Sequence, residues 1–142
     1  MKNRTFVFVS ISVVSHIILL VLFVYKSNEL NVFSLIGFMY LPILLNLIFC
    51  GIQTYISKKE TYIKTAVIYT GISFCYWFVN TVYLSQTDKI ALIYERSMQY
   101  SSNEISISQG NPFVSGIIYL IIAFLLYWFI GKIAGGHVKK RK

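Results

Sequence analysis

The chain has 142 residues, of which 56% are hydrophobic and only 13% are charged. A soluble domain carries roughly 25% charged residues, and a chain of this size could not bury so much apolar surface in a soluble fold. The formal net charge is +8, but no nucleic-acid-binding motif is present and most basic residues flank apolar segments, which favours contact with anionic lipid headgroups over contact with nucleic acid.

Four apolar segments follow one another along the chain, over residues 6–25, 32–56, 63–84 and 113–130, and together they contain one charged residue, Lys64. At about 1.5 Å rise per residue, each is long enough to cross a hydrocarbon core of roughly 30 Å, the last with little to spare. A backbone inside a bilayer must satisfy its own hydrogen bonds, so we expect helices. The sequence therefore predicts an all-α membrane protein with four transmembrane helices in an antiparallel bundle.

Basic residues are sorted to one set of connections. Ten of the thirteen Lys and Arg residues lie before the first segment, between the second and third segments or at the start of the third, or after the fourth. Because Lys and Arg are retained on the cytoplasmic side, this pattern predicts that both termini are cytoplasmic. The residue usage, rich in Ile, Phe, Tyr, Lys, Asn and Ser, is typical of an AT-rich bacterial genome, so we expect a multi-pass protein of a bacterial plasma membrane.

Polar residues of the first three segments are predicted to lie at one depth. Counted from the predicted cytoplasmic ends, His16, Asn46 and Ser73 are each ten residues into their segments, or about 15 Å deep. A polar layer at this depth either forms a hydrogen-bonded cluster that fixes how the helices face one another, or it is a proton or ligand site built around the ionisable His16. No segment contains a carboxylate, which favours the structural interpretation.

The sequence predicts no catalytic site, no metal site and no cofactor. It contains no CxxC pair, no His/Cys cluster at metal-ligand spacing, no GxSxG motif and no phosphate-binding glycine loop. The two cysteines, Cys50 and Cys75, are expected at depths that differ by roughly 9 Å, which is too far for a disulfide.

The connection over residues 85–111 is much longer than the first two, which have six residues each. Ile90, Ile93, Tyr94 and Met98 follow helical spacing, so a short amphipathic helix is predicted, and Ser85 or Thr87 is a candidate N-cap. Residues 102–110 alternate between polar and apolar types and predict a short extended stretch before Pro112 begins the fourth helix.

This long connection offers the only sizeable surface to a partner outside the cell. Aromatic residues, Met and Arg are enriched at the centres of protein interfaces, so the candidate contact residues are Tyr94, Arg96, Met98 and Tyr100. The alternative is a passive lid. We expect residues 1–131 to form the transmembrane domain.

The basic tail, residues 132–142, is predicted to be a flexible cytoplasmic arm. Its final residues are predicted to contact anionic lipid, namely Lys139, Lys140, Arg141 and Lys142.

These features predict a protein that binds another protein or peptide. The layout resembles that of small immunity proteins against pore-forming toxins, which are basic and have three or four spans joined by short loops; an accessory subunit of a larger membrane complex is a second candidate. The alternative is a small homo-oligomeric transporter or channel, which a continuous polar stripe from Gln53 through Asn46 and His16 to Asn80 would favour.

Overall fold

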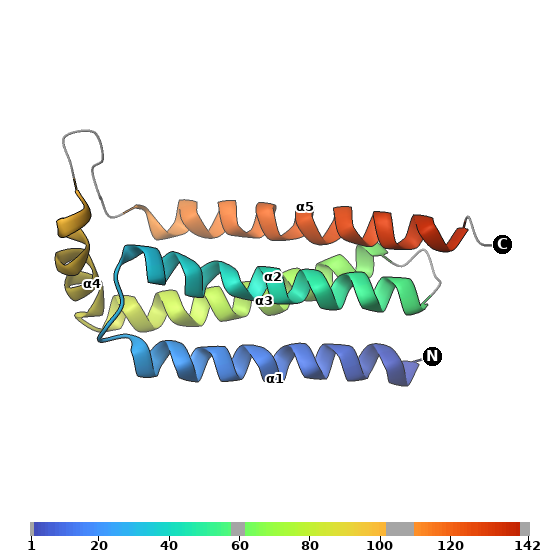
Figure 1. The fold of residues 1–142 in the computed structure, drawn as a ribbon, viewed down its shortest axis with the longest axis horizontal. Helices are drawn as coiled ribbons and strands as arrows, with labels where there is room; N and C mark the ends of the chain where they lie inside the picture. The colour runs from blue at the N-terminus through green and yellow to red at the C-terminus, as the bar shows by residue number, and fades with distance from the viewer. Residues whose placement is uncertain (1, 58–61, 102–109, 140–142) are drawn as a thin grey trace.

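The computed structural model describes residues 2–57, 62–101 and 110–139, and within these ranges the chain is helical, with no strand. The elements are α1 (Lys2–Lys26), α2 (Val32–Ser57), α3 (Tyr62–Gln86), α4 (Lys89–Ser97), the 3-10 turn η1 (Met98–Tyr100) and α5 (Pro112–Lys139). Figure 1 shows the four long helices side by side, with both termini at one end of the molecule and α4 lying across the other end.

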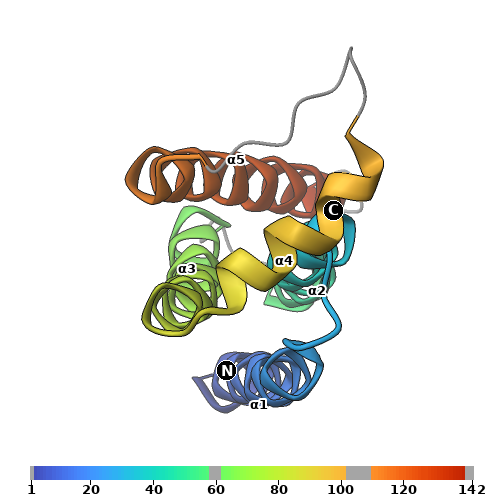
Figure 2. The same ribbon diagram turned by 90° about the vertical axis from the view of Figure 1, so that its left-hand side faces the viewer.

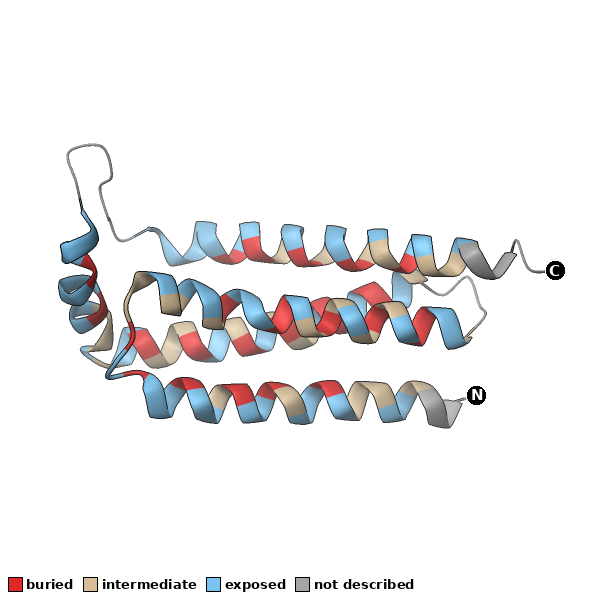
Figure 3. Ribbon diagram, in the orientation of Figure 1, coloured by how far each residue is buried: buried red, intermediate tan, exposed pale blue. Residues whose placement is uncertain are grey.

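Four of the helices are long and apolar enough to cross a membrane. In the described part of the chain these spans are Thr5–Lys26, Val32–Ser57, Tyr62–Gln86 and Pro112–Gly136. No more than a third of each apolar window is buried inside the protein, and Figure 3 shows exposed residues along the outer sides of α1 and α5. Such an apolar exterior suits lipid, so the expectation of an all-helical, multi-pass membrane protein is confirmed at this level.

The four long helices form three layers. α2 and α3 lie side by side in the middle, with α5 packed on one side of the pair and α1 on the other (Figure 2). α5 makes its contacts with α3 and α2, and α1 likewise contacts α2 and α3. Any link between the outer layers therefore passes through the middle pair.

Asparagine side chains cap the N-termini of two of the long helices. The Oδ1 atom of Asn31 accepts the Ser34 N–H at 2.9 Å, and the Ser34 Oγ atom accepts the Asn31 N–H at 2.9 Å, which is a reciprocal capping arrangement at the start of α2. Asn111 Oδ1 accepts the Phe113 N–H at 2.9 Å, and Pro112, which has no N–H to satisfy, occupies the first position of α5.

Buried apolar side chains form two clusters. The larger lies between α2, α3 and α5 and contains Ile43, Cys50, Ala66, Tyr69, Tyr119, Ala123 and Tyr127. The smaller lies at the α4 end and joins α1, α2, α3 and α4 through Phe23, Leu30, Met39, Leu84 and Ile93. The second cluster therefore ties α4 to the bundle.

Two details of the sequence interpretation are wrong. α5 continues to Lys139, so the first part of the predicted flexible tail is helical; Gly135 and Gly136 cost a helix only about 1 kcal/mol each relative to Ala and do not end it. Neither Ser85 nor Thr87 caps α4, because their hydroxyls donate to the carbonyls of α3 residues and Asp88 occupies the N-cap position. Most of the predicted extended stretch, residues 102–109, lies outside the described residues.

Candidate functional site

Asn46 on α2 is the centre of a buried polar cluster halfway along the bundle. Its Oδ1 atom accepts a hydrogen bond from Ser12 Oγ of α1 at 2.5 Å, and its Nδ2 atom donates to Ser73 Oγ of α3 at 2.8 Å. Nδ2 also lies 3.3 Å from His16 Nε2 of α1. The structure thus brings together His16, Asn46 and Ser73, the three residues that the sequence places at one depth.

The cluster extends to the fourth long helix through a tyrosine. The Tyr127 hydroxyl of α5 lies 2.7 Å from Ser73 Oγ, and the carbonyl of Tyr69 lies 3.3 Å from Asn46 Nδ2. Asn46 therefore faces three acceptors with two N–H groups, so one hydrogen is shared. We call Ser12, His16, Asn46, Ser73 and Tyr127 the midplane cluster; it joins all four long helices.

His16 has a defined tautomer in this cluster. Its Nδ1 atom lies 2.8 Å from the Ser12 carbonyl, which can only accept, so Nδ1 carries the hydrogen. Nε2 is then free to accept from the Asn46 amide, whose orientation is set by the Ser12 hydroxyl. The ring also makes an edge contact with Tyr76, with centroids 5.7 Å apart. His16 is satisfied as a neutral side chain, which is what a structural role requires.

Sequence reasoning missed the buried tyrosines. Tyr69, Tyr76, Tyr119 and Tyr127 are all 3% exposed or less. Their spacing was the available signal, because residues seven or eight positions apart share one helical face. The Tyr69 hydroxyl donates to Gln53 Oε1 at 2.7 Å. This hydrogen bond lies on the side of the midplane cluster that is away from α4.

Other polar atoms on the α4 side of the cluster are buried without a hydrogen-bond partner. Within the described residues, these include both amide atoms of Asn80 and the hydroxyls of Tyr76 and Tyr119. Because native proteins satisfy nearly all buried polar groups, these atoms are the ones for which a polar ligand or water would supply the missing hydrogen bonds.

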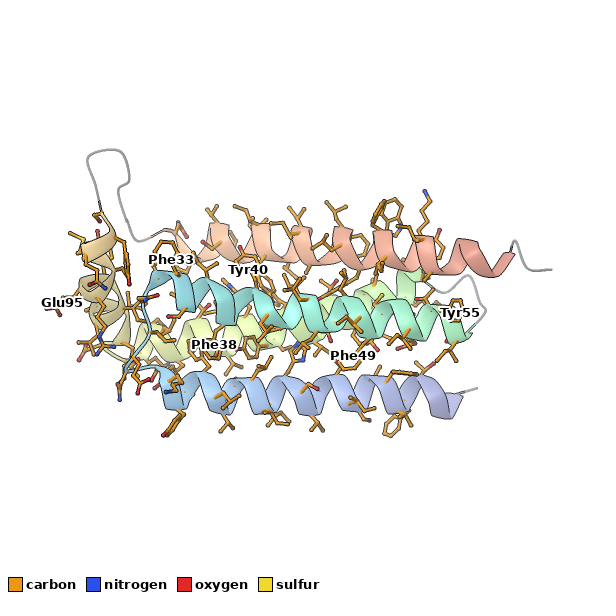
Figure 4. The ribbon with its side chains drawn as sticks, in the orientation of Figure 1. Phe33, Phe38, Tyr40, Phe49, Tyr55 and Glu95 are labelled. Carbon is orange, nitrogen blue, oxygen red and sulfur yellow. The ribbon has the colours of Figure 1, made fainter. Side chains whose placement is uncertain are left out.

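A second candidate region lies at the α4 end. Tyr94, Arg96, Met98 and Tyr100 are all exposed, and we call them the α4 surface. The Tyr100 ring makes an edge contact with Phe33 at the start of α2, with centroids 5.2 Å apart. Figure 4 labels Phe33 on the side of α4 that faces the bundle, and Glu95 of α4 on the side away from the bundle.

The predicted apolar stripe of α4 is only partly buried. Ile93 is buried and Ile90 is half-buried, but Met98 is exposed. The reason is that the buried face of α4 runs through Ile93 and on to the residue four positions later, whereas Met98 lies four positions after the exposed Tyr94 and shares its face. The residue that shares the buried face with Ile93 is Ser97.

Ser97 attaches α4 to the start of α2. Its Oγ atom accepts the Val32 N–H at 2.8 Å and donates to the Ile93 carbonyl at 2.5 Å. The Val32 N–H is one of the amides that a helix N-terminus leaves without an intrahelical partner. A second link joins Lys89 of α4 to Asn28 in the α1–α2 connection.

The same connection contains an ion pair between Lys26 and Glu29, with Nζ and Oε2 2.7 Å apart. The hydrogen bond from Lys26 lowers the pKa of the Glu29 carboxyl, but both side chains are exposed to solvent, so the pair contributes little to stability.

The predicted lipid contact of the basic tail falls outside the described side chains. Lys140, Arg141 and Lys142 are not among the described residues, and of Lys139 only the helical backbone is. That contact stays a prediction. Further along α5 towards the bundle, the Lys132 ammonium lies 5.2 Å from the centroid of the Trp128 ring.

The described residues hold no group of three or more His, Cys, Asp or Glu side chains that could bind a metal ion. Cys50 and Cys75 are both free thiols. Comparison with known protein families, curated proteins and solved structures finds no match to this chain.

Proposed function

We propose that this is a non-catalytic, multi-pass plasma-membrane protein that binds a partner protein or peptide through the α4 surface. In this proposal the four spans are antiparallel, both termini are cytoplasmic, and α4 faces the outside of a bacterial cell. The observation that carries it is the exposure of the large apolar side chains of the α4 surface: Tyr94 is 37% exposed, Tyr100 is 43% exposed and Met98 is 50% exposed.

Contact with lipid explains the exposed apolar residues on the spans. It does not explain those of α4, because α4 lies across the ends of the spans. A surface with two tyrosines, a methionine and an arginine has the composition of an interface centre. Ile93 and Ser97 hold α4 against the bundle, so the α4 surface is already in place before a partner arrives. Such pre-organisation lowers the entropic cost of binding.

Two kinds of protein would use such a surface. An immunity protein would capture a pore-forming toxin or peptide as it approaches the membrane, and an accessory subunit would hold a larger membrane protein by the same residues. The charge distribution supports an outer location for α4, because the connection over residues 85–111 holds few of the basic residues.

Site-specific photo-crosslinking in intact cells tests the proposal. A photo-reactive phenylalanine analogue placed at Tyr94, Met98 or Tyr100 is expected to form one discrete adduct with the protein or peptide encoded beside this chain's gene. The matched control is Tyr55 of α2, which is also an exposed tyrosine but lies at the opposite end of the bundle. Arg96→Glu should remove the adduct without affecting membrane insertion. Equal adducts at Tyr55 and Tyr100 would exclude a specific α4 surface.

A homo-oligomeric transporter or channel is the second candidate, and one observation favours it. Buried polar side chains run from Gln53 through the midplane cluster to Asn80, and those on the α4 side have unpaired atoms. Purified protein in vesicles would then form an oligomer and release a trapped small solute, and Asn80→Leu would block the release. A monomer that leaves the vesicles sealed excludes this candidate.

A further inference from the structure

A cavity of about 690 Å³ lies between α3, α4 and α5 at the α4 end of the bundle, and the first turn of α2 contributes Val32 and Leu35 to its lining. Its walls are mainly apolar and aromatic, with Phe74, Trp77 and Phe78 from α3 and Phe113, Ile117 and Leu120 from α5. Phe78, Phe113 and Ile117 are all exposed on the outside of the bundle. The cavity is therefore a groove that opens sideways, towards the region that lipid occupies.

The groove continues along the α3–α5 seam. A second hollow of about 340 Å³ lies between Val67 and Thr70 of α3 and Phe124 and Leu125 of α5, and Leu120 lines both hollows. On α5 the lining residues extend from Pro112 to Leu125, which is about 20 Å of helix. One leaflet of a hydrocarbon core is about 15 Å thick, so the seam runs through a whole leaflet.

The lining changes character along this length. Residues with hydroxyl groups, among them Ser85 and Tyr94, lie at the α4 end. From Trp77 to Leu120 the lining is mainly apolar, and Thr70 lies in the second hollow. Among the described residues, the lining includes no charged side chain. A ligand with a polar end near α4 and an apolar remainder along the α3–α5 seam matches this order.

Gly116 allows the Trp77 ring to pack against α5, and this packed ring forms the inner wall of the groove. A Cβ atom at Gly116 would lie 2.7 Å from Cη2 of Trp77, so a glycine is needed for the indole to lie against α5. The indole also stacks on Tyr119, with centroids 5.9 Å apart. Trp77 and Tyr119 therefore close the groove towards the bundle interior, and the groove opens towards lipid.

We propose that this groove binds one acyl chain of a phospholipid from the leaflet on the α4 side. The choice of occupant rests on where the groove opens and how it is lined. Phe78, Phe113 and Ile117 are exposed at its side, where lipid lies, and the seam is as long as one leaflet. Hydroxyl-bearing residues at the α4 end followed by a mainly apolar seam match the order of a phospholipid headgroup and its acyl chain.

The chain's two tryptophans provide the test, because Trp77 lines the groove and Trp128 does not. Trp128→Phe leaves Trp77 as the single fluorophore, and the protein is reconstituted in phosphatidylcholine vesicles that contain a fraction of phosphatidylcholine with brominated acyl chains. Bromine quenches tryptophan on contact. We expect quenching of Trp77 to rise in proportion to the brominated fraction, as it does when a single exchangeable lipid site contacts the indole. Contact with several bulk lipids would instead give a steep rise that levels off.

Two groove-filling variants, Thr81→Phe and Val82→Phe, should each remove most of this quenching, because both residues line the groove. The matched control is Val79→Phe on the same helix, which faces outwards, is 47% exposed and does not line the groove. It should leave the quenching unchanged. Circular dichroism of each variant checks that the helices are intact.

Either of two further results also overturns the proposal. Quenching that is the same in both groove-filling variants as in the parent shows that Trp77 meets only bulk lipid. A Trp77 that brominated lipid fails to quench shows that another occupant, such as a partner's helix or a second copy of the chain, covers the groove.

Discussion

The indole of Trp77 on α3 lies so close to the backbone of Gly116 on α5 that a Cβ atom there would be 2.7 Å from Cη2 and 2.9 Å from Cζ3. Gly116→Ala should therefore destabilise the protein, since overpacking costs about 1–3 kcal/mol and the higher helix propensity of Ala returns only about 1 kcal/mol. Thermal unfolding in detergent measures the difference.

The control for this prediction is Gly71→Ala on α3, where a Cβ atom would meet nothing within 4 Å. Gly71→Ala should be as stable as the parent protein or more stable. If the two variants behave alike, the close approach of α3 and α5 at Trp77 is not what limits substitution at Gly116.

Ser12→Ala should destabilise the bundle by about 0.6–1.7 kcal/mol, the range measured for hydrogen bonds between membrane helices. The cause is that Asn46 Oδ1 loses its donor in the buried midplane cluster. Asn46→Leu should cost more, because Ser12, His16 and Ser73 all lose a partner, but it should still insert. Reversible unfolding in mixed micelles gives both values.

Ser15→Ala serves as the control for Ser12→Ala. Ser15 is on the same helix, and its hydroxyl donates at 2.9 Å to the Ile11 carbonyl within α1. Its loss should change stability little. If both substitutions lower the free energy of unfolding equally, the hydrogen bond from Ser12 to Asn46 contributes no more to stability than a hydrogen bond within one helix.

Ser97→Ala should loosen α4 while leaving the spans intact. The partly buried Val32 N–H would lose its acceptor, and leaving a fully buried donor unsatisfied costs about 1–3 kcal/mol, so the cost here should lie at the low end of that range. Hydrogen exchange should quicken across α4 and stay unchanged in α3. Ser101→Ala, at an exposed residue, is the comparison, and α4 exchange that is equally fast in both variants would contradict the role of Ser97.

Cysteine labelling tests the predicted topology in a background without Cys50 and Cys75. A membrane-impermeant maleimide should modify a cysteine at position 101 in intact cells, and one at position 57 only after the cells are permeabilised. The reason is the retention of Lys and Arg on the cytoplasmic side. The opposite labelling pattern would place α4 in the cytoplasm and exclude a partner that approaches from outside.

The depth of the polar residues could be predicted because it depends on the position of each residue along its own helix. His16, Asn46 and Ser73 follow from counting residues, since the rise per residue is constant. Their neighbours could not be found in this way. Tyr127 joins the cluster through its contact with Ser73, and that contact depends on how α5 is rotated against α3.

The start of α5 at Pro112 and the helix of the long connection were also predictable, because they depend on local features such as a cap, a proline or a helical spacing. The direction in which α4 faces was not. The bundle buries Ile93 and Ser97 and leaves Met98 exposed, because Ser97 binds a backbone N–H of α2, 65 residues earlier in the chain.

The sequence by itself determined that the described chain is helical and that four of its helices can cross a membrane, because hydrocarbon excludes unpaired backbone groups and so makes local apolar length decisive. Only the tertiary structure decided which helix faces meet. The outer positions of α1 and α5, the polar side chains that gather around Asn46 and the groove beside Trp77 all depend on side-chain fit between segments far apart in the chain. Between apolar helices in lipid, that fit comes from close packing and a few hydrogen bonds, which a hydrophobic pattern does not record.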